Sequence, residues 1–134
     1  MNVVVCTIAG FRCAFPLSAV RGFVARDQVD ERPQGYFWDG ILWYHVAPVW
    51  PYPVQSDIIL LLATDVLPIA WPVDQGEGVM TLNESAVYPL PHGWQIDRQP
   101  WLVGVAFSDT CAIYLVNVDH IAARLHAHWV AVHD

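Results

Sequence analysis

The amino-acid sequence predicts an all-β fold with one helix at the C-terminal end. Between residues 3 and 116, short β-branched and apolar runs alternate with turn signals at close intervals. This pattern is typical of barrels and sandwiches rather than of a parallel α/β sheet. After residue 117 the apolar residues recur at helical spacing instead. With 134 residues, the chain has the length of a single domain.

The first half of the chain is expected to contain several short strands and one aromatic hairpin. Extended segments are expected at residues 3–9, 13–15, 22–26, 36–38 and 41–46, with one helical turn at 17–20. Asp39 and Gly40 suit the positive φ angles of a type I′ turn, so the last two of these strands should pair as a hairpin. The polar stretch Asp27–Gly35 is expected to be a surface loop.

The second half repeats this organisation and then changes period. Strands are expected at residues 57–63, 66–73, 79–82, 101–107 and 111–116, with a turn at 74–78 and an irregular, proline-rich loop at 88–100. A helix over about 118–132 follows from the spacing of Val118, Ile121, Leu125 and Trp129. Asn117 or Asp119 is available to cap it.

Charge and cysteine content exclude several classes of function. Thirteen acidic residues oppose six arginines, lysine is absent, and the formal net charge is −7. Such a chain repels phosphate backbones and anionic lipids, so we expect neither nucleic-acid nor membrane binding. The most apolar run, Ile58–Ala63, is far shorter than the roughly 20 residues of a membrane helix. Cys6, Cys13 and Cys111 are odd in number and form no CxxC, which indicates reduced thiols in a cytoplasmic protein.

No arrangement typical of catalysis or metal binding is evident in the sequence. The serines lie in no G-x-S-x-G elbow, and no cysteine has a histidine at a family-specific spacing. Four histidines cluster in the tail, at positions 120, 126, 128 and 133, but Arg124 lies among them and no tightly spaced carboxylate or thiol accompanies them. We therefore interpret them as a solvated helix face, and we expect no metal, no cofactor and no enzymatic activity.

Aromatic residues are concentrated in one segment. Seven of the chain's seventeen aromatics lie within the seventeen residues 36–52: Tyr36, Phe37, Trp38, Trp43, Tyr44, Trp50 and Tyr52. Both faces of the strand beginning at Ile41 are apolar or aromatic, so it should have no ordinary solvated side. Two interpretations remain open: a strand covered on both faces, or a protein-binding surface, where Trp and Tyr are enriched.

Three segments, in order along the chain, resemble the CheW-like domain, the adaptor module of bacterial chemosensory systems. The segment Phe11–Val20 (FRCAFPLSAV) is similar to a strand ending in "aIPl" followed by a short turn and a valine. Val73–Val79 corresponds to the family's "VDeV" strand and turn. Leu102–Ala106 and Ala112–Asp119 are similar to its closing hairpin and "llDld" ending. The family's Gly-x-x-Asn-Leu-Arg-Gly run is replaced here by Gly35–Gly40 (GYFWDG), which has neither Asn nor Arg.

The resemblance implies one domain over residues 1–134, built of two small five-stranded barrels similar to SH3 barrels that share a hydrophobic seam. We place the switch between the two lobes near residues 54–57. The family's adaptors bind the regulatory domain of a histidine kinase through barrel surfaces and the tip of a chemoreceptor in the groove between the lobes. Another CheW-like protein is a further candidate partner.

Our hypothesis is therefore a non-enzymatic, cytoplasmic CheW-like adaptor with a diverged partner surface. The residues expected to bind the partner are Tyr36, Phe37, Trp38, Trp43 and Tyr44. Phe15, Pro16 and Val20 match the family's framework. Two alternatives remain: a structural subunit whose aromatic surface forms a homo-oligomer, and a small-molecule binder or enzyme that uses the cleft between lobes with His45 or His92.

Overall fold

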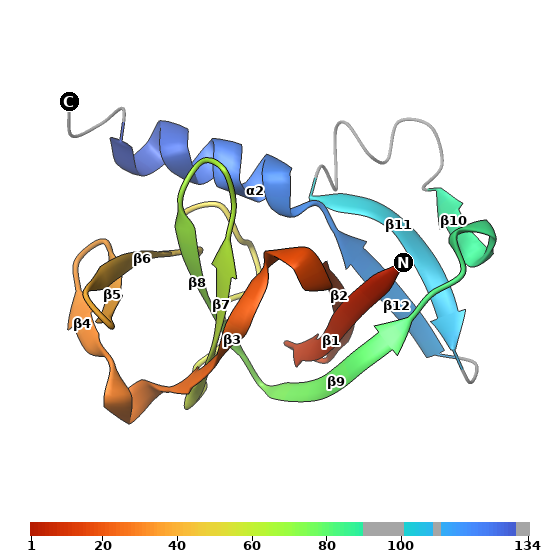
Figure 1. The fold of residues 1–134 in the computed structure, drawn as a ribbon, viewed down its shortest axis with the longest axis horizontal. Helices are drawn as coiled ribbons and strands as arrows, with labels where there is room; N and C mark the ends of the chain where they lie inside the picture. Colours follow the sequence, from red (N-terminus) through yellow and green to blue (C-terminus); the bar gives the residue numbers. More distant parts are fainter. Residues whose placement is uncertain (90–100, 109–110, 131–134) are drawn as a thin grey trace.

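The computed structural model describes residues 1–89, 101–108 and 111–130 (Figure 1). Just over half of the described residues lie in strands, arranged as two sheets that lie side by side. In Figure 1 one helix begins beside the end of β12 and runs along the top of the second sheet. The predicted fold class, all-β with a C-terminal helix, is confirmed.

The first sheet combines the two ends of the chain. Its six strands follow the order β10-β11-β12-β2-β1-β9, and all neighbours are antiparallel except β12 and β2. The strands are β1 (Asn2–Ile8), β2 (Phe11–Pro16), β9 (Gln75–Thr81), β10 (Val87–Pro89), β11 (Leu102–Ser108) and β12 (Cys111–Val116). A β-bulge between Val5 and Cys6 interrupts the pairing of β1 with β9.

The second sheet is formed by the middle of the chain. Its six strands follow the order β3-β7-β8-β6-β5-β4, with β6 and β8 parallel. The strands are β3 (Val20–Ala25), β4 (Asp30–Arg32), β5 (Gly35–Trp38), β6 (Ile41–His45), β7 (Ile58–Ala63) and β8 (Pro68–Val73). One 3-10 turn, Leu17–Ala19, links β2 to β3 and fulfils the expected helical turn; a second, Arg26–Gln28, precedes β4.

The two lobes differ in detail from the expected five-stranded barrels. Each sheet has six strands, and in the described part of the chain its two edge strands do not pair with each other. The lobe boundary also lies elsewhere than expected, because residues 54–57 connect β6 and β7 within the second sheet. The chain instead crosses between sheets at 17–19 and again at Asp74.

Two other local expectations were wrong. The stretch 74–78, expected to be a turn, is mostly part of β9, because β1 provides a pairing edge for it. The expected loop Asp27–Gly35 contains β4, which pairs with β5 although all three of its side chains are exposed. The expected irregular loop at 88–100 begins within β10, and from residue 90 onward it lies outside the described residues.

The helix begins where expected and changes its winding before it ends. Asn117 caps α2 (Val118–Leu125), since its side-chain oxygen accepts a hydrogen bond from the amide of His120 at 3.1 Å. Val118, Ile121, Ala122 and Leu125 are buried beneath it. A π-helical segment, His126–Val130, continues the helix, and the expected end at 132 lies outside the described residues.

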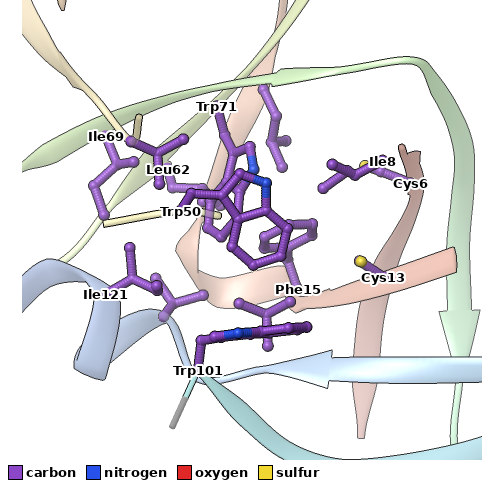
Figure 2. Packing of buried hydrophobic residues seen from close by; sticks show 14 of the residues in the cluster. Cys6, Ile8, Cys13, Phe15, Trp50, Leu62, Ile69, Trp71, Trp101 and Ile121 are labelled. Atoms are coloured by element: carbon purple, nitrogen blue, oxygen red, sulfur yellow. The ribbon is translucent and has the colours of Figure 1, made fainter. Parts of the chain in front are cut away.

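The largest core cluster lies between the sheets and beneath α2. Figure 2 shows its aromatic centre, where Trp50, Trp71 and Trp101 come from three separate segments of the chain. Trp50 makes edge-to-face contacts with Trp71 and Trp101, at ring-centroid distances of 4.8 and 4.6 Å. Phe15 from β2 contacts Trp71 at 5.0 Å in the same geometry. Several of the chain's aromatic side chains therefore lie inside the molecule, at the seam between the lobes.

Candidate protein-binding site

The aromatic hairpin β5–β6 does not present all of its predicted binding residues to solvent. Tyr36 and Trp43 pair across the two strands and are only 2% and 6% exposed, within a core cluster of the second sheet. Tyr44 is half-buried against the main core, and Trp38 packs at the margin of the Tyr36 cluster. Phe37 is 36% exposed, which makes it the most accessible of the five predicted residues.

The hairpin turn has the conformation that its sequence predicts. Asp39 and Gly40 both have positive φ angles, 51° and 76°. This is the left-handed geometry of a type I′ turn, which matches the twist of the flanking strands. The turn brings Trp38 opposite Ile41, which is 44% exposed. Because side chains alternate along a strand, Ile41 lies on the face of Trp38 and Trp43, and the exposed Phe37 lies on the opposite face of the hairpin.

A polar cluster supports the hairpin from beneath. The Arg26 guanidinium donates one hydrogen bond to Glu31 at 2.8 Å and another to the Tyr36 hydroxyl at 3.3 Å. Burial raises the pKa of Tyr36, an effect that Arg26 opposes and Glu31 reinforces. On the outer side, the Arg32 guanidinium lies 5.0 Å from the centre of the Phe37 ring. Phe37 is thus an accessible aromatic residue beside a cation.

His45, at the end of β6, makes contacts through both its ring and its Nδ1 atom. Its ring lies 5.3 Å from the ring of Tyr36, and its Nδ1 accepts a hydrogen bond from the amide of Ala47 at 2.9 Å. Burial lowers the pKa of His45, and the nearby Arg26 lowers it further, against a smaller opposite effect of Glu31. Nδ1 therefore serves as an acceptor in the neutral ring, which gives His45 a structural role in the 45–47 turn. His92, the other histidine considered at the sequence level, lies outside the described residues.

The three framework residues connect the two lobes. Phe15 is fully buried in the main core, and Pro16 ends β2 at the 3-10 turn. Val20 opens β3 and packs against the same core. Together they carry the chain from the first sheet to the edge of the second, so the family-like segment determines where β3 lies.

A second candidate surface, not expected from the sequence, lies between the edge strands β3 and β9. Here the molecule has an open apolar groove of about 470 Å³, lined by Phe23, Val24, Ala25, Ile58, Gly76 and Gly78. Phe23 is 44% exposed, and Val79, next along β9, is 64% exposed. In Figure 1, β9 begins close to β3 and then curves away from it along the lower side of the molecule.

Glycine at position 76 allows this close approach of the two edges. A Cβ atom there would lie 3.1 Å from the Phe23 ring, which itself forms the wall of the groove. The signal for the groove was present in the sequence, because glycine within a strand marks close approach of another group. It was missed because Gly76 and Gly78, among acidic residues, were interpreted as a turn.

Two of the three cysteines, Cys6 and Cys13, are unsuited to nucleophilic chemistry. Cys6 and Cys13 face each other across β1 and β2, and both are fully buried. Burial raises the pKa of each thiol to about 12, so neither is a thiolate at neutral pH.

Among the described residues, no group of three or more His, Cys, Asp or Glu side chains is placed to hold a metal ion. None of the described helices is long and apolar enough to cross a membrane.

Comparison with known proteins supports the fold. No protein-family model and no curated protein sequence matches this chain. Among solved structures, the scaffolding protein TtCheW from Thermoanaerobacter tengcongensis matches it with a TM-score of 0.70 and 16% sequence identity. The match covers 90% of this chain and 86% of that chain. The chain therefore has a CheW-like fold, as its three weak sequence patterns predicted.

Proposed function

We propose that this chain is a non-enzymatic adaptor of a bacterial chemosensory signalling system, located in the cytoplasm. Its partners would be the regulatory domain of a histidine kinase, the tip of a chemoreceptor, or another CheW-like protein. The observation that carries the proposal is the open apolar groove between β3 and β9, which lies where the two lobes of a CheW-like fold meet. Its centre combines an exposed phenylalanine with unpaired strand edges, two features of protein-binding surfaces.

The outer part of the aromatic hairpin is a second contact region in this proposal. Phe37 and Ile41 are exposed there, on opposite faces of the hairpin, whereas Tyr36 and Trp43 are buried in a core cluster. An aromatic ring with few rotatable bonds offers contact area at low entropic cost. Tyr36, Trp38, Trp43 and Tyr44 would then act chiefly by holding the hairpin in place.

The test is binding of the purified chain to a kinase regulatory domain and to a receptor-tip fragment from the same cell, measured by calorimetry. We expect Phe23→Ser to weaken binding of at least one partner by tenfold or more. The matched control is Val66→Ser: Val66 is 47% exposed and lies in the turn at the opposite end of β7 from Ile58. If the monomeric chain binds none of these partners, the adaptor proposal is wrong. If light scattering instead shows a stable homo-oligomer that Phe37→Ala dissociates, the hairpin is a subunit interface.

A further inference from the structure

A second cavity lies beside α2, next to the main core. It has a volume of about 450 Å³ and shares no lining residue with the groove between β3 and β9. Three segments that are far apart in the sequence line it: residues 47–51 after β6, Trp101 just before β11, and Arg124 in the last turn of α2. Its volume is in the range of small-molecule sites.

The walls of this pocket are held in place by contacts within the protein. The amides of Val49 and Trp50 donate hydrogen bonds to the carbonyl of Val46, at 3.0 and 3.1 Å, and close the turn after β6. The carbonyl of Trp101 accepts the amide of Asn117 at 2.6 Å, which joins this wall to the start of α2. Figure 2 shows the indoles of Trp50 and Trp101 packed against each other. The pocket is therefore formed before any ligand enters it.

The charged side chain of this pocket, Arg124, has no partner within the described part of the chain. Arg12 and Arg26 form ion pairs with glutamates, and Arg21 donates hydrogen bonds to backbone carbonyls. Arg32 lies over an aromatic ring. Arg124 alone among the described arginines makes no such contact, and no acidic side chain lines its pocket. Its guanidinium is therefore available to an anion from outside the chain.

The other side chains that line the pocket are apolar. Trp50 and Trp101 contribute indole rings, and Pro48 and Pro51 contribute rings without a backbone N–H donor. A ligand that fills the pocket needs an anionic end for the guanidinium and an apolar body for these rings. A carboxylate matches two parallel N–H donors of a guanidinium. One guanidinium balances one negative charge, and the chain's net charge of −7 disfavours a more highly charged anion such as phosphate.

We propose that this pocket binds a small organic monocarboxylate, with its carboxylate against Arg124 and an apolar or aromatic body against Trp101 and Pro48. The site is separate from the partner surfaces of the proposed adaptor, and the inference does not depend on that function. Because its walls come from α2 and from the turn after β6, a bound ligand would also link these two elements.

The test is an NMR titration of the isotope-labelled chain with benzoate, followed through the indole N–H signals of Trp50 and Trp101. We expect at least one of these signals to shift and to saturate. Benzamide has the same ring and no charge, so it should bind at least tenfold more weakly. Inorganic phosphate should compete poorly with benzoate, and binding of benzoate should weaken as ionic strength rises.

Variants of the pocket separate a specific site from general charge attraction. Arg124→Gln should weaken benzoate binding tenfold or more, and Arg124→Lys should lie between this variant and the parent, because lysine keeps the charge without the planar pair of donors. Ala47→Glu adds a carboxylate at an exposed edge of the pocket and should also weaken binding. The matched control is Arg21→Gln, which removes an exposed arginine outside this pocket and should change nothing. Arg124 is exposed, so its variants should stay folded, which circular dichroism verifies.

Three outcomes would overturn the proposal: no saturable shift with benzoate, equal binding of benzoate and benzamide, or unchanged binding in Arg124→Gln. Phosphate that competes as well as benzoate would also overturn it, because the guanidinium would then attract anions of any kind. Calorimetry with the kinase regulatory domain and the receptor tip is the separate measurement for the adaptor function. Arg124→Gln should bind these proteins as the parent does; loss of a protein partner without any benzoate binding would assign Arg124 to a protein interface instead.

Discussion

The indole Nε1 of Trp129 donates a hydrogen bond to the backbone carbonyl of His45, 3.4 Å away, and thereby fastens the C-terminal helical segment to β6. The two residues are 84 positions apart in the sequence. The same histidine holds Ala47 through its ring and Gln34 through its amide. One residue thus links the aromatic hairpin, the turn that follows it, and the helix.

The first prediction concerns this link. Trp129→Phe should keep most of the packing of Trp129 against the core and lose the indole donor, at a cost of about 1 kcal/mol in the free energy of unfolding. Trp129→Ala should cost clearly more, because apolar contact is lost as well. Urea denaturation measures both, with Ala127→Ser, at an exposed position of the same segment, as the control. Equal stability of the parent and Trp129→Phe would show that the hydrogen bond contributes nothing.

The second prediction is a pH dependence that originates at His45. Its pKa is lowered in the folded chain, so the unfolded chain binds a proton first as the pH falls. Stability from this residue is therefore fully present above the unfolded pKa, near 6.5, and is lost as the pH falls from there toward the lower folded pKa. Protonation also removes the acceptor of the Ala47 amide.

His45→Asn serves as the comparison, since an amide oxygen can accept from Ala47 without titrating. The free energy of unfolding, measured by urea denaturation between pH 5 and pH 8, should decline more steeply for the parent than for the variant. Parallel curves would mean that His45 is not responsible for the decline.

Elements whose conformation is determined by neighbouring residues could be predicted from the sequence, and elements that depend on pairing with distant strands could not. The type I′ turn at Asp39-Gly40 was predicted because two adjacent residues select its backbone conformation. The first part of β9, residues 75–78, was missed because its glycine-rich, acidic sequence resembles a turn, and only its pairing with β1, some seventy residues earlier, makes it a strand. The strand order of the first sheet could not be predicted for the same reason, because β12 pairs with β2, which lies far from it in the sequence.

The exposure of the candidate site residues could not be predicted from the sequence either. Periodicity indicated that both faces of β6 are apolar, and it could not show which face another layer would cover. The structure places Trp43 inward and leaves Phe37 and Ile41 accessible. The groove depends on two edge strands that meet only in the folded chain, so the glycines of β9 could indicate a close approach but not which strand approaches them.

The third prediction separates these inner and outer aromatics. Trp43→Ala should reduce the free energy of unfolding by roughly 3–5 kcal/mol, because it empties a buried position. Phe37→Ala should change it by less than about 1 kcal/mol, and should act on partner binding instead. Thermal denaturation and calorimetry on the same preparations make the comparison. A binding defect in Trp43→Phe, without loss of stability, would contradict this division.

The fourth prediction tests the close approach of β5 to β6. A Cβ atom at Gly35 would collide with the backbone carbonyl oxygen of Trp43 and would lie 2.8 Å from the amide nitrogen of His45. Backbone atoms cannot rotate away as a flexible side chain can, so Gly35→Ala should prevent the hairpin from forming. We expect little folded protein, measured by circular dichroism and by yield in the soluble fraction. Gly40→Asn is the control, because asparagine tolerates the positive φ angle of 76° in an open turn.

The fifth prediction uses the contrast among the three thiols. Cys6 and Cys13 are fully buried with pKa values raised to about 12, whereas Cys111 is exposed on β12. Only a thiolate that a reagent can reach will react, so the folded chain should titrate with one fast thiol per molecule at pH 8 in a colorimetric disulfide-exchange assay. Denaturant should expose all three. Cys111→Ser should abolish the fast phase and leave the slow one, whose rate then measures the opening of the β1–β2 core. A fast phase that survives Cys111→Ser would mean that β1 and β2 separate readily, and that local opening of the main core costs less free energy than its burial indicates.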